Sequence, residues 1–210
     1  MATLLALAGC EEARPGRTGV SFVESGAFQT YYAADGRLLR LLYDGDGDRR
    51  AEVITLYGPE GRPVSAEIDS DRDGTVDRWE ELGPEGRATR VGTSLRTPGR
   101  PDAWTALDAE GRPIRRERDE DGDGRVDHIE YLEDGRVVRE EQDTDGDGRM
   151  DVGRAIDPSG AVSEEWDTDH DGKPDRRVLR SAAGEVIGIE IDPQGRGTWT
   201  RVKAAGGVRR

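Results

Sequence analysis

The chain has 210 residues, of which 45 are acidic and 31 are Lys or Arg, so its formal net charge is −14. Only 33% of it is hydrophobic, while 36% is charged. The acidic balance argues against a nucleic-acid partner, because such proteins present a basic surface. No apolar run reaches the roughly 18 residues that a membrane span requires. A hydrophobic content this low is close to that of disordered chains, so the order of the glycines and aspartates decides the interpretation.

The amino terminus has the character of an export signal. Residues 1–10 form a short apolar run that ends in small residues, which is typical of a secretory signal and its cleavage site. The segment Leu7-Ala8-Gly9-Cys10 resembles the bacterial lipoprotein box, although no Lys or Arg precedes the run. The resemblance implies lipidation at Cys10 and a protein anchored by lipid to the bacterial cell envelope or surface. The alternative is a buried amino-terminal strand or helix with an incidental cysteine. We expect a flexible tether over residues 11–26.

The rest of the chain is one repeat. Self-similarity at a period of 20–50 residues is the signature of a repeat architecture, and here glycines recur every 24 or 25 residues, at positions 36, 61, 86, 111, 135, 160 and 184. Each glycine is followed by a strand-like segment, an acidic loop and a second strand-like segment. Asp134-Gly135 lies between β-forming residues, which is a strong hairpin signal. The segments are too short for helices.

These features predict an all-β fold of tandem antiparallel hairpins of about 25 residues, arranged as an elongated meander or solenoid-like sheet with calcium-binding connecting loops. The hairpin domain is expected over residues 27–203, with a tail at 204–210. Phe28–Tyr32 fits a leading half-repeat, and Thr198–Val202 fits a closing strand.

Two columns of apolar residues follow from aligning the repeats on their glycines. Aligned apolar positions usually pack together, so we predict that both columns belong to the core face of successive hairpins. A ligand-binding aromatic strip is the alternative. The first column is Ile54, Trp79, Trp104 and Ile129, and the second is Tyr57, Leu82, Leu107, Leu132 and Ile156.

Five acidic loops share one spacing, in which carboxylates stand at alternate positions and a fourth follows. Calcium takes six to eight oxygen ligands, and a glycine after the third carboxylate turns the backbone so that the oxygens surround one point. The pattern predicts about four to five calcium sites. The expected ligands are Asp44, Asp46, Asp48 and Glu52; Asp69, Asp71, Asp73 and Asp77; Asp119, Asp121, Asp123 and Asp127; Asp143, Asp145, Asp147 and Asp151; and Asp167, Asp169, Asp171 and Asp175.

Each loop is similar to the first nine positions of an EF-hand loop, and also resembles the aspartate-rich loops of dockerins and thrombospondin type 3 repeats. The EF-hand's closing glutamate has a counterpart only in Glu80 and Glu130, and the flanking helices are missing, so helix-opening behaviour does not carry over. The first loop has Arg49 in place of the glycine. The third repeat has lost the pattern and holds Ser94, Arg96 and Pro98 instead, although Asp102 remains.

The alternative for these loops is acidic turns that only solubilise the protein, because Asp and Gly are favoured in turns. A turn does not require four carboxylates at this spacing, and packing like charges closely is unfavourable without a cation. Magnesium is a poorer match, since it seldom accepts an all-protein cage. Five bound calcium ions would change the net charge from −14 to −4.

The hairpins have relatives of their own. Tyr31-Tyr32-Ala33-Ala34-Asp35-Gly36-Arg37-Leu38 and Tyr131-Leu132-Glu133-Asp134-Gly135-Arg136-Val137 resemble the Tyr-Asp repeats of Rhs-type bacterial surface proteins and, more loosely, MORN-like hairpins. The resemblance implies a chain of hairpins and implies no activity.

We expect no enzyme. The two histidines are His128, which follows a loop, and His170, which stands inside one at a position whose side chain is predicted to point away. With them no convergent catalytic set can be assembled. The predicted function is a calcium-binding, envelope-anchored structural or adhesive repeat protein. A surface module that binds a protein or glycan through the Trp79 and Trp104 column is the alternative, and a hydrolase using paired carboxylates is a third reading.

Overall fold

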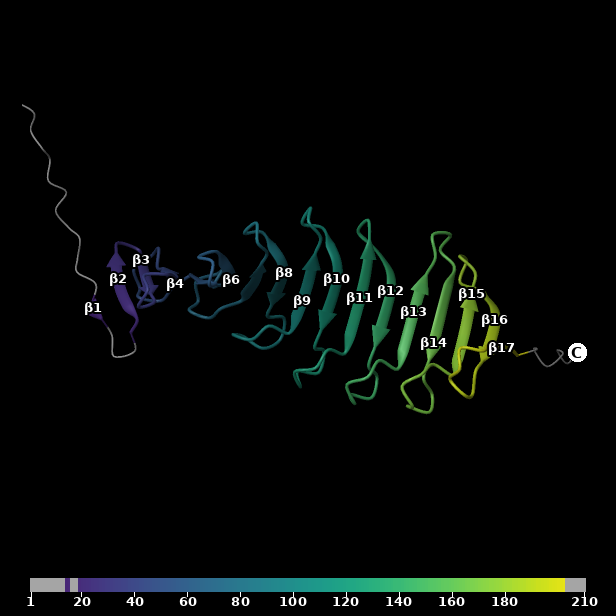
Figure 1. Cartoon of the computed structure of the whole chain (residues 1–210). Coiled ribbons are helices and arrows are strands. Elements are labelled where there is room, and N and C mark those ends of the chain that lie inside the picture. Colours follow the sequence, from purple (N-terminus) through teal and green to yellow (C-terminus); the bar gives the residue numbers. More distant parts are fainter. Residues whose placement is uncertain (1–13, 16–18, 203–210) are drawn as a thin grey trace, which may run out of the picture. The chain divides into compact units, whose positions relative to one another are not determined.

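The computed structural model describes residues 14–15 and 19–202, and all regular structure in this part of the chain is β-strand (Figure 1). The predicted signal at 1–10 with Cys10, and the tail at 204–210, lie outside the described residues. Within the described part, no helix has the length and apolar character needed to cross a membrane. The chain forms two compact units. The amino-terminal unit runs to Ser94 and includes Pro98–Pro101, and the carboxyl-terminal unit includes Leu95–Thr97 and continues from Asp102.

The amino-terminal unit is an antiparallel meander in which each strand pairs with the next along the chain. Its strands are β1 (Arg14–Pro15), β2 (Ser21–Ser25), β3 (Phe28–Tyr32), β4 (Leu38–Tyr43), β5 (Val53–Tyr57), β6 (Pro63–Ile68), β7 (Arg78–Leu82) and β8 (Ala88–Thr93).

The carboxyl-terminal unit repeats the same plan, again with consecutive antiparallel pairs. Its strands are β9 (Ala103–Leu107), β10 (Pro113–Arg118), β11 (His128–Glu133), β12 (Arg136–Gln142), β13 (Val152–Ile156), β14 (Val162–Trp166), β15 (Arg176–Arg180), β16 (Val186–Ile191) and β17 (Thr200–Arg201). The prediction of an all-β array of hairpin repeats is therefore confirmed.

One boundary was predicted wrongly. Strand β2 lies inside the range 11–26 that was expected to be a tether, and it pairs with β3 in continuous register from Ser21 opposite Tyr32 to Ser25 opposite Phe28. Phe22 packs on Tyr31 with ring centroids 5.1 Å apart. Aromatic cross-strand pairs of this kind stabilise a sheet, so the ordered array begins before Phe28.

The glycines that set the period form the tight turns. All seven have positive φ, between 71° and 86°, which glycine adopts without the steric cost that a side chain brings. Asp134 and Gly135, with φ of 49° and 76°, make a two-residue turn between β11 and β12. In the carboxyl-terminal unit these turns lie at one end of the strands and the acidic loops lie at the other (Figure 1).

The two apolar columns do not share a face. Residues three apart on a strand point to opposite sides of a sheet, so on β11 Ile129 shares a face with Tyr131 and Leu132 shares the other face with Glu130. The prediction of one core face was therefore wrong. Both Ile129 and Leu132 are buried, but Trp79 and Trp104 are only half-buried.

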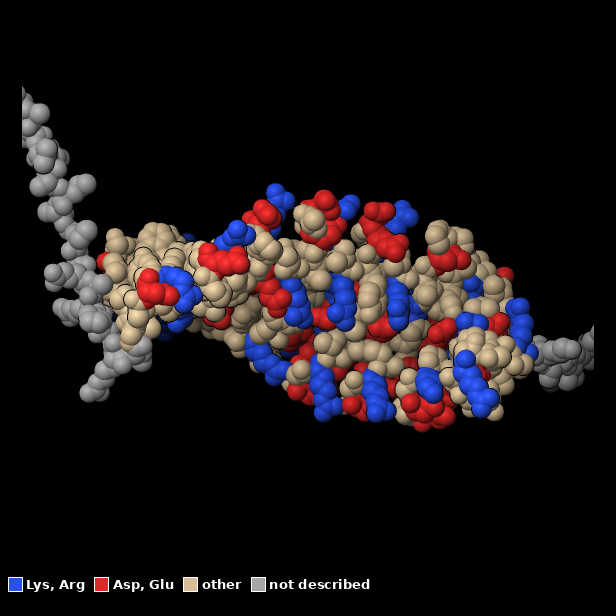
Figure 2. Space-filling model, in the orientation of Figure 1, with Lys and Arg blue, Asp and Glu red and all other residues tan. Residues whose placement is uncertain are grey.

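Charged ladders run across the strands of the carboxyl-terminal unit, and on the face seen in Figure 2 basic and acidic side chains lie side by side over the strands. On one face, Arg177 lies 3.3 Å from Glu165 and 2.9 Å from Glu190, its neighbours on both adjoining strands. On the other face, Arg116 lies 3.1 Å from Glu130. Opposite-charge cross-strand pairs are worth about 0.2–1 kcal/mol each, and the arginine stems shield the sheet. The sheet thus holds together with few buried apolar groups: Ala66, Ile129, Leu132 and Val178 among the described residues.

Candidate metal sites

We number the nine residues of each acidic loop as positions 1–9 and call the loops loop 1 (44–52), loop 2 (69–77), loop 3 (119–127), loop 4 (143–151) and loop 5 (167–175). Two backbone hydrogen bonds close each of loops 2 to 5. In loop 4, the Asp151 N–H donates to the Gln142 carbonyl at 2.7 Å, and the Asp143 N–H donates to the carbonyl of Asp127, position 9 of the preceding loop, at 2.8 Å. Successive loops within a unit are therefore fixed beside one another.

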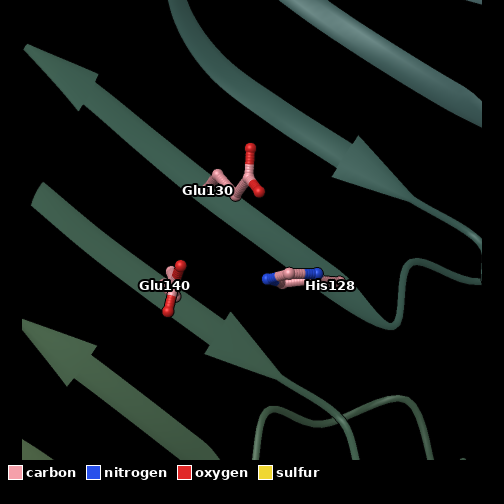
Figure 3. Close-up of side chains that lie close together, drawn as sticks. All are labelled: His128, Glu130 and Glu140. Atoms are coloured by element: carbon pink, nitrogen blue, oxygen red, sulfur yellow. The ribbon is translucent and has the colours of Figure 1, made fainter. Parts of the chain in front are cut away.

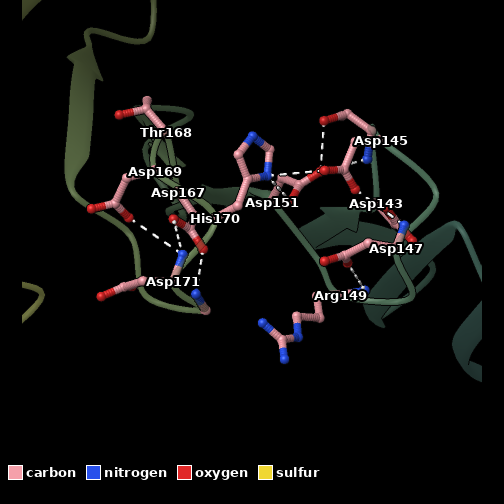
Figure 4. Close-up of polar contacts among 12 residues, drawn as sticks. Asp143, Asp145, Asp147, Arg149, Asp151, Asp167, Thr168, Asp169, His170 and Asp171 are labelled. Carbon is pink, nitrogen blue, oxygen red and sulfur yellow. Dashed lines mark hydrogen bonds and ion pairs between the residues drawn. The ribbon is translucent and has the colours of Figure 1, made fainter.

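The carboxylates at positions 1, 3 and 5 are held by the backbone of their own loop. In loop 4, Asp143 accepts hydrogen bonds from the Gly146 and Gly148 N–H groups at 2.8 and 2.7 Å. Asp145 accepts one at 3.1 Å from the Asp147 N–H (Figure 4). Position 4 has positive φ in all five loops, as does position 6. The chain therefore curls around its acidic side chains, as the position-6 glycine predicts.

This curl brings carboxylate oxygens of several positions close together. The oxygens of three acidic side chains lie within 4.8 Å of one another in loops 1, 2 and 3, in the sets Asp44, Asp46 and Asp48; Asp69, Asp71 and Asp77; and Asp119, Asp121 and Asp127. In loop 4, Asp145 and Asp151 share such a group with His170. Oxygens at this spacing can surround a divalent ion.

Two of the buried carboxylates keep an oxygen that is not satisfied. Asp69 is only 6% exposed, and its Oδ2 accepts from the Gly74 N–H at 2.8 Å, while its Oδ1 has no hydrogen-bond partner among the described residues. Glu52 is 8% exposed, and its Oε1 also has no hydrogen-bond partner among the described residues. A buried anionic oxygen without a partner is costly. The Asp69 atom is therefore a place where a cation would be stabilised.

Position 9, predicted as the fourth ligand, also closes the loop. Asp127 accepts from the Glu120 and Asp121 N–H groups at 2.5 and 3.0 Å, and Asp151 accepts from the Thr144 N–H at 2.7 Å. Asp102 does the same in the third repeat, which has lost the other acidic residues. This role was not predicted from the sequence, although the retention of Asp102 in that repeat was its signal.

Replacing Asp102 with Ala should destabilise the protein by about 2–3 kcal/mol, because Asp102 is 5% exposed and its loss leaves the N–H groups of Leu95, Arg96 and Thr97 without their acceptor. Urea unfolding measures the change, and it should be the same with calcium and with chelator, since this loop has no metal site. A loss seen only with calcium would contradict a purely structural role.

The same variant has a defined pH dependence. Burial alone would raise the pKa of Asp102, but the three backbone N–H donors outweigh it and hold the pKa below its ordinary value of 3.8. A carboxyl with a lowered folded pKa stabilises the protein above its unfolded pKa, and that contribution is lost as the pH falls below 3.8 through the folded pKa. The difference between the wild-type chain and Asp102→Ala should therefore shrink over that acidic range.

Side chains from one loop reach its neighbour. The Arg125 guanidinium of loop 3 donates to the Gly146 carbonyl of loop 4 at 3.1 Å. In loop 2, a Cβ at Gly74 would lie 2.1 Å from the Arg50 guanidinium of loop 1, so the position-6 glycine also leaves room for the preceding loop's arginine. The side chain of His170 was predicted to point away from its own loop, and its Nδ1 lies 3.1 Å from Asp145 and 3.4 Å from Asp151 of the adjacent loop 4 (Figure 4).

Loop 1 differs from the others in two ways. Arg49 stands at position 6 with a φ of 73°, which is strained for a residue with a side chain. A hydrogen bond from the Gly45 N–H lowers the pKa of Glu52, and the charge of Arg72 from loop 2 contributes in the same direction. A built-in positive charge near Glu52 opposes the binding of a cation there.

A second group with a histidine lies on the sheet face of the carboxyl-terminal unit, where His128 stands beside Glu130 and Glu140 (Figure 3). Its carboxylates already have basic partners: Glu130 lies 3.1 Å from Arg116 and 3.2 Å from Arg118, and Glu140 lies 3.1 Å from Arg154. Three guanidinium groups would repel a cation. The group is therefore part of the charged ladder.

Comparison with known proteins identifies no family. No family model matches the chain, and no curated protein matches it. Among solved structures, accessory secretory proteins 1, 2 and 3 of Streptococcus pneumoniae match with 18% identity over 54% of this chain and 19% of that one, at a TM-score of 0.29. S. aureus TarM, in complex with Fondaparinux, α-GlcNAc-glycerol and UDP, matches with 12% identity over 60% of this chain and 21% of that one, at a TM-score of 0.28. The chain spans about a fifth of the length of these structures.

Proposed function

We propose that this protein is a calcium-binding structural or adhesive repeat protein of the bacterial cell envelope, in which Ca²⁺ orders the acidic loops. The observation that carries the proposal is the buried Oδ1 of Asp69, which lacks a partner among the described residues although oxygens of Asp71 and Asp77 lie within 4.8 Å of an Asp69 oxygen. A group of carboxylates with an unsatisfied buried oxygen suits a hard cation that takes only oxygen ligands.

Calcium would act here as a source of folding free energy. Each loop gathers like charges that repel one another, and a bound divalent ion removes that repulsion. The loops are joined by backbone hydrogen bonds from position 1 of one loop to position 9 of the preceding loop. Order in one loop would therefore support its neighbours in the same unit, as in other repeat arrays where stability depends on adjacent units.

The anchoring part of the proposal rests on the sequence alone. Cys10 and its apolar run resemble a lipoprotein signal, and they lie outside the described residues. Labelling of the expressed protein with a radioactive fatty acid, compared with a Cys10→Ala variant, tests it. Label in the wild-type chain that is lost in the variant supports the anchor, and equal labelling of both overturns it.

Calorimetric titration of the metal-free full chain with CaCl₂ tests the central proposal. We expect about four calcium ions per chain, each bound at about 10⁻⁴–10⁻³ M as in extracellular calcium modules. Loops 2 to 5 should account for them, because the charge of Arg72 opposes binding in loop 1. Absence of binding at millimolar calcium would overturn the function.

Replacing Arg72 with Gly should add a fifth calcium ion to the titration. Position 4 is glycine in loops 1, 3 and 4, and Arg72 has a φ of 61°, so the substitution removes both a strained conformation and the opposing charge. We expect the affinity of loop 1 to rise by about ten-fold, which corresponds to about 1.4 kcal/mol. Arg87→Gln is the matched control, because it removes the same charge from an exposed turn. An equal gain in the control would indicate a general effect of net charge.

A further inference from the structure

The carboxyl-terminal unit brings a nitrogen ligand into an acidic loop. His170 Nδ1, from position 4 of loop 5, lies 3.1 Å from Asp145 Oδ2 and 3.4 Å from Asp151 Oδ1 of loop 4 (Figure 4). One atom from each of the three side chains falls within 4.8 Å of the other two. Asp151 is deeply buried, with 6% of its side chain exposed, whereas His170 and Asp145 are partly open to solvent.

The two carboxylates divide their oxygens between the loop and the imidazole. Asp145 accepts the Asp147 N–H through Oδ1 and turns Oδ2 toward His170. Asp151 accepts the Thr144 N–H and hydroxyl through Oδ2 and turns Oδ1 toward His170. The backbone bonds thus hold each carboxylate in place and aim its other oxygen at one point.

We propose that His170, Asp145 and Asp151 form a site for a borderline divalent transition metal such as Zn²⁺, which joins loop 5 to loop 4. Zinc binds imidazole nitrogen and carboxylate oxygen at about 2.0–2.2 Å, so neighbouring ligand atoms lie about 3.4 Å apart in a tetrahedral centre. The two distances from Nδ1, 3.1 and 3.4 Å, are of this size. A fourth position is open to water on the exposed side.

The ligand chemistry separates this site from the other loops. Calcium selects oxygen ligands, whereas an imidazole with two carboxylates suits zinc and its first-row neighbours. His170 holds its place with a φ of 58°, in the left-handed region where glycine stands at the same position in three other loops. The inference rests on the proposed function in that zinc would take the Asp145 and Asp151 oxygens of loop 4 in place of calcium, so its outcome is separate from calcium binding by loops 2, 3 and 5.

The test is a zinc titration of the full chain, stripped of metal and then returned to calcium-containing buffer so that the other loops are filled, with a chromophoric chelator that prefers zinc as competitor. We expect one zinc ion per wild-type chain, and a Kd at least about ten-fold higher in His170→Gly. Gly occupies this position in loops 1, 3 and 4, so the variant should fold, and its far-ultraviolet circular dichroism checks this. His128→Gln, which changes the chain's other histidine, should bind zinc as the wild type does.

A spectroscopic measurement distinguishes a metal site from a simple ion pair between a protonated His170 and the two carboxylates. Co²⁺ in place of zinc should give visible ligand-field absorption in the wild type and in His128→Gln, and should lose it in His170→Gly. Equal zinc affinity in wild type and His170→Gly would overturn the site and leave the ion pair. If zinc fails while calcium still binds, only this inference falls; if calcium binding fails as well, the proposed function falls with it.

Discussion

Removal of calcium from the full chain is expected to lower the melting temperature of the carboxyl-terminal unit by about 15–30 °C. At about 1 mM free calcium, a loop with a Kd of about 10⁻⁴ M stabilises the folded state by about 1.4 kcal/mol. Loops 3, 4 and 5 all lie in this unit, which gives about 4 kcal/mol. For a domain of about 100 residues, each kcal/mol corresponds to about 4–8 °C.

The amino-terminal unit should respond less. It contains only loops 1 and 2, and the charge of Arg72 acts on Glu52 in loop 1. Its expected gain from calcium is therefore close to that of one loop, about 1.4 kcal/mol under the same conditions. The melting temperatures of the two units should therefore fall by different amounts when calcium is replaced by chelator.

Tryptophan fluorescence can follow the units separately. Trp79 is the single tryptophan of the amino-terminal unit, whereas Trp104, Trp166 and Trp199 lie in the other. A Trp79→Phe variant thus reports on the carboxyl-terminal unit alone, and circular dichroism reports on both. Magnesium at the same concentration is the control ion. A melting temperature that is unchanged by chelator would show that the loops are only solubilising turns.

The hairpin array could be predicted because two local signals repeat. Positive φ at the period glycines, such as Gly61 and Gly111, is a property of single residues, so it is visible in the sequence. The same holds for position 6 of the acidic loops. Strand β2 was missed because Ser21–Ser25 carries neither signal: its place is fixed by pairing with β3, which is a contact between segments.

Contacts between neighbouring repeats could not be predicted from the spacing of residues within one repeat. Both columns, at Ile129 and at Leu132, align well in the repeat, but only the strand pleat shows that they face opposite sides. His170 points away from its own loop, as expected, yet the adjacent loop lies there. Register and stacking decide both outcomes, and neither is a local property of the chain.

Asp69→Asn should change the stability of the protein in opposite directions with and without calcium. Without the ion, the buried Asp69 Oδ1 is a charged atom with no partner among the described residues, close to the carboxylates of Asp71 and Asp77. An amide keeps an oxygen for the Gly74 N–H and can donate from its nitrogen to those carboxylates. Removing the charge should therefore stabilise the metal-free protein, by about 1 kcal/mol.

With calcium present, the same substitution removes a charged ligand and should cost the stabilisation that loop 2 provides, about 1.4 kcal/mol or more. Urea unfolding of the full chain in calcium and in chelator measures both values. Asp102→Asn is the matched control, because both of its carboxylate oxygens already accept backbone N–H groups, so it should destabilise the protein equally in both conditions. If Asp69→Asn behaved as Asp102→Asn does, the buried oxygen would serve the loop's own hydrogen bonding and calcium would have no place in loop 2. If the stability change caused by Asp69→Asn has opposite signs with calcium and with chelator, and that caused by Asp102→Asn does not, the folded loop must bind a cation.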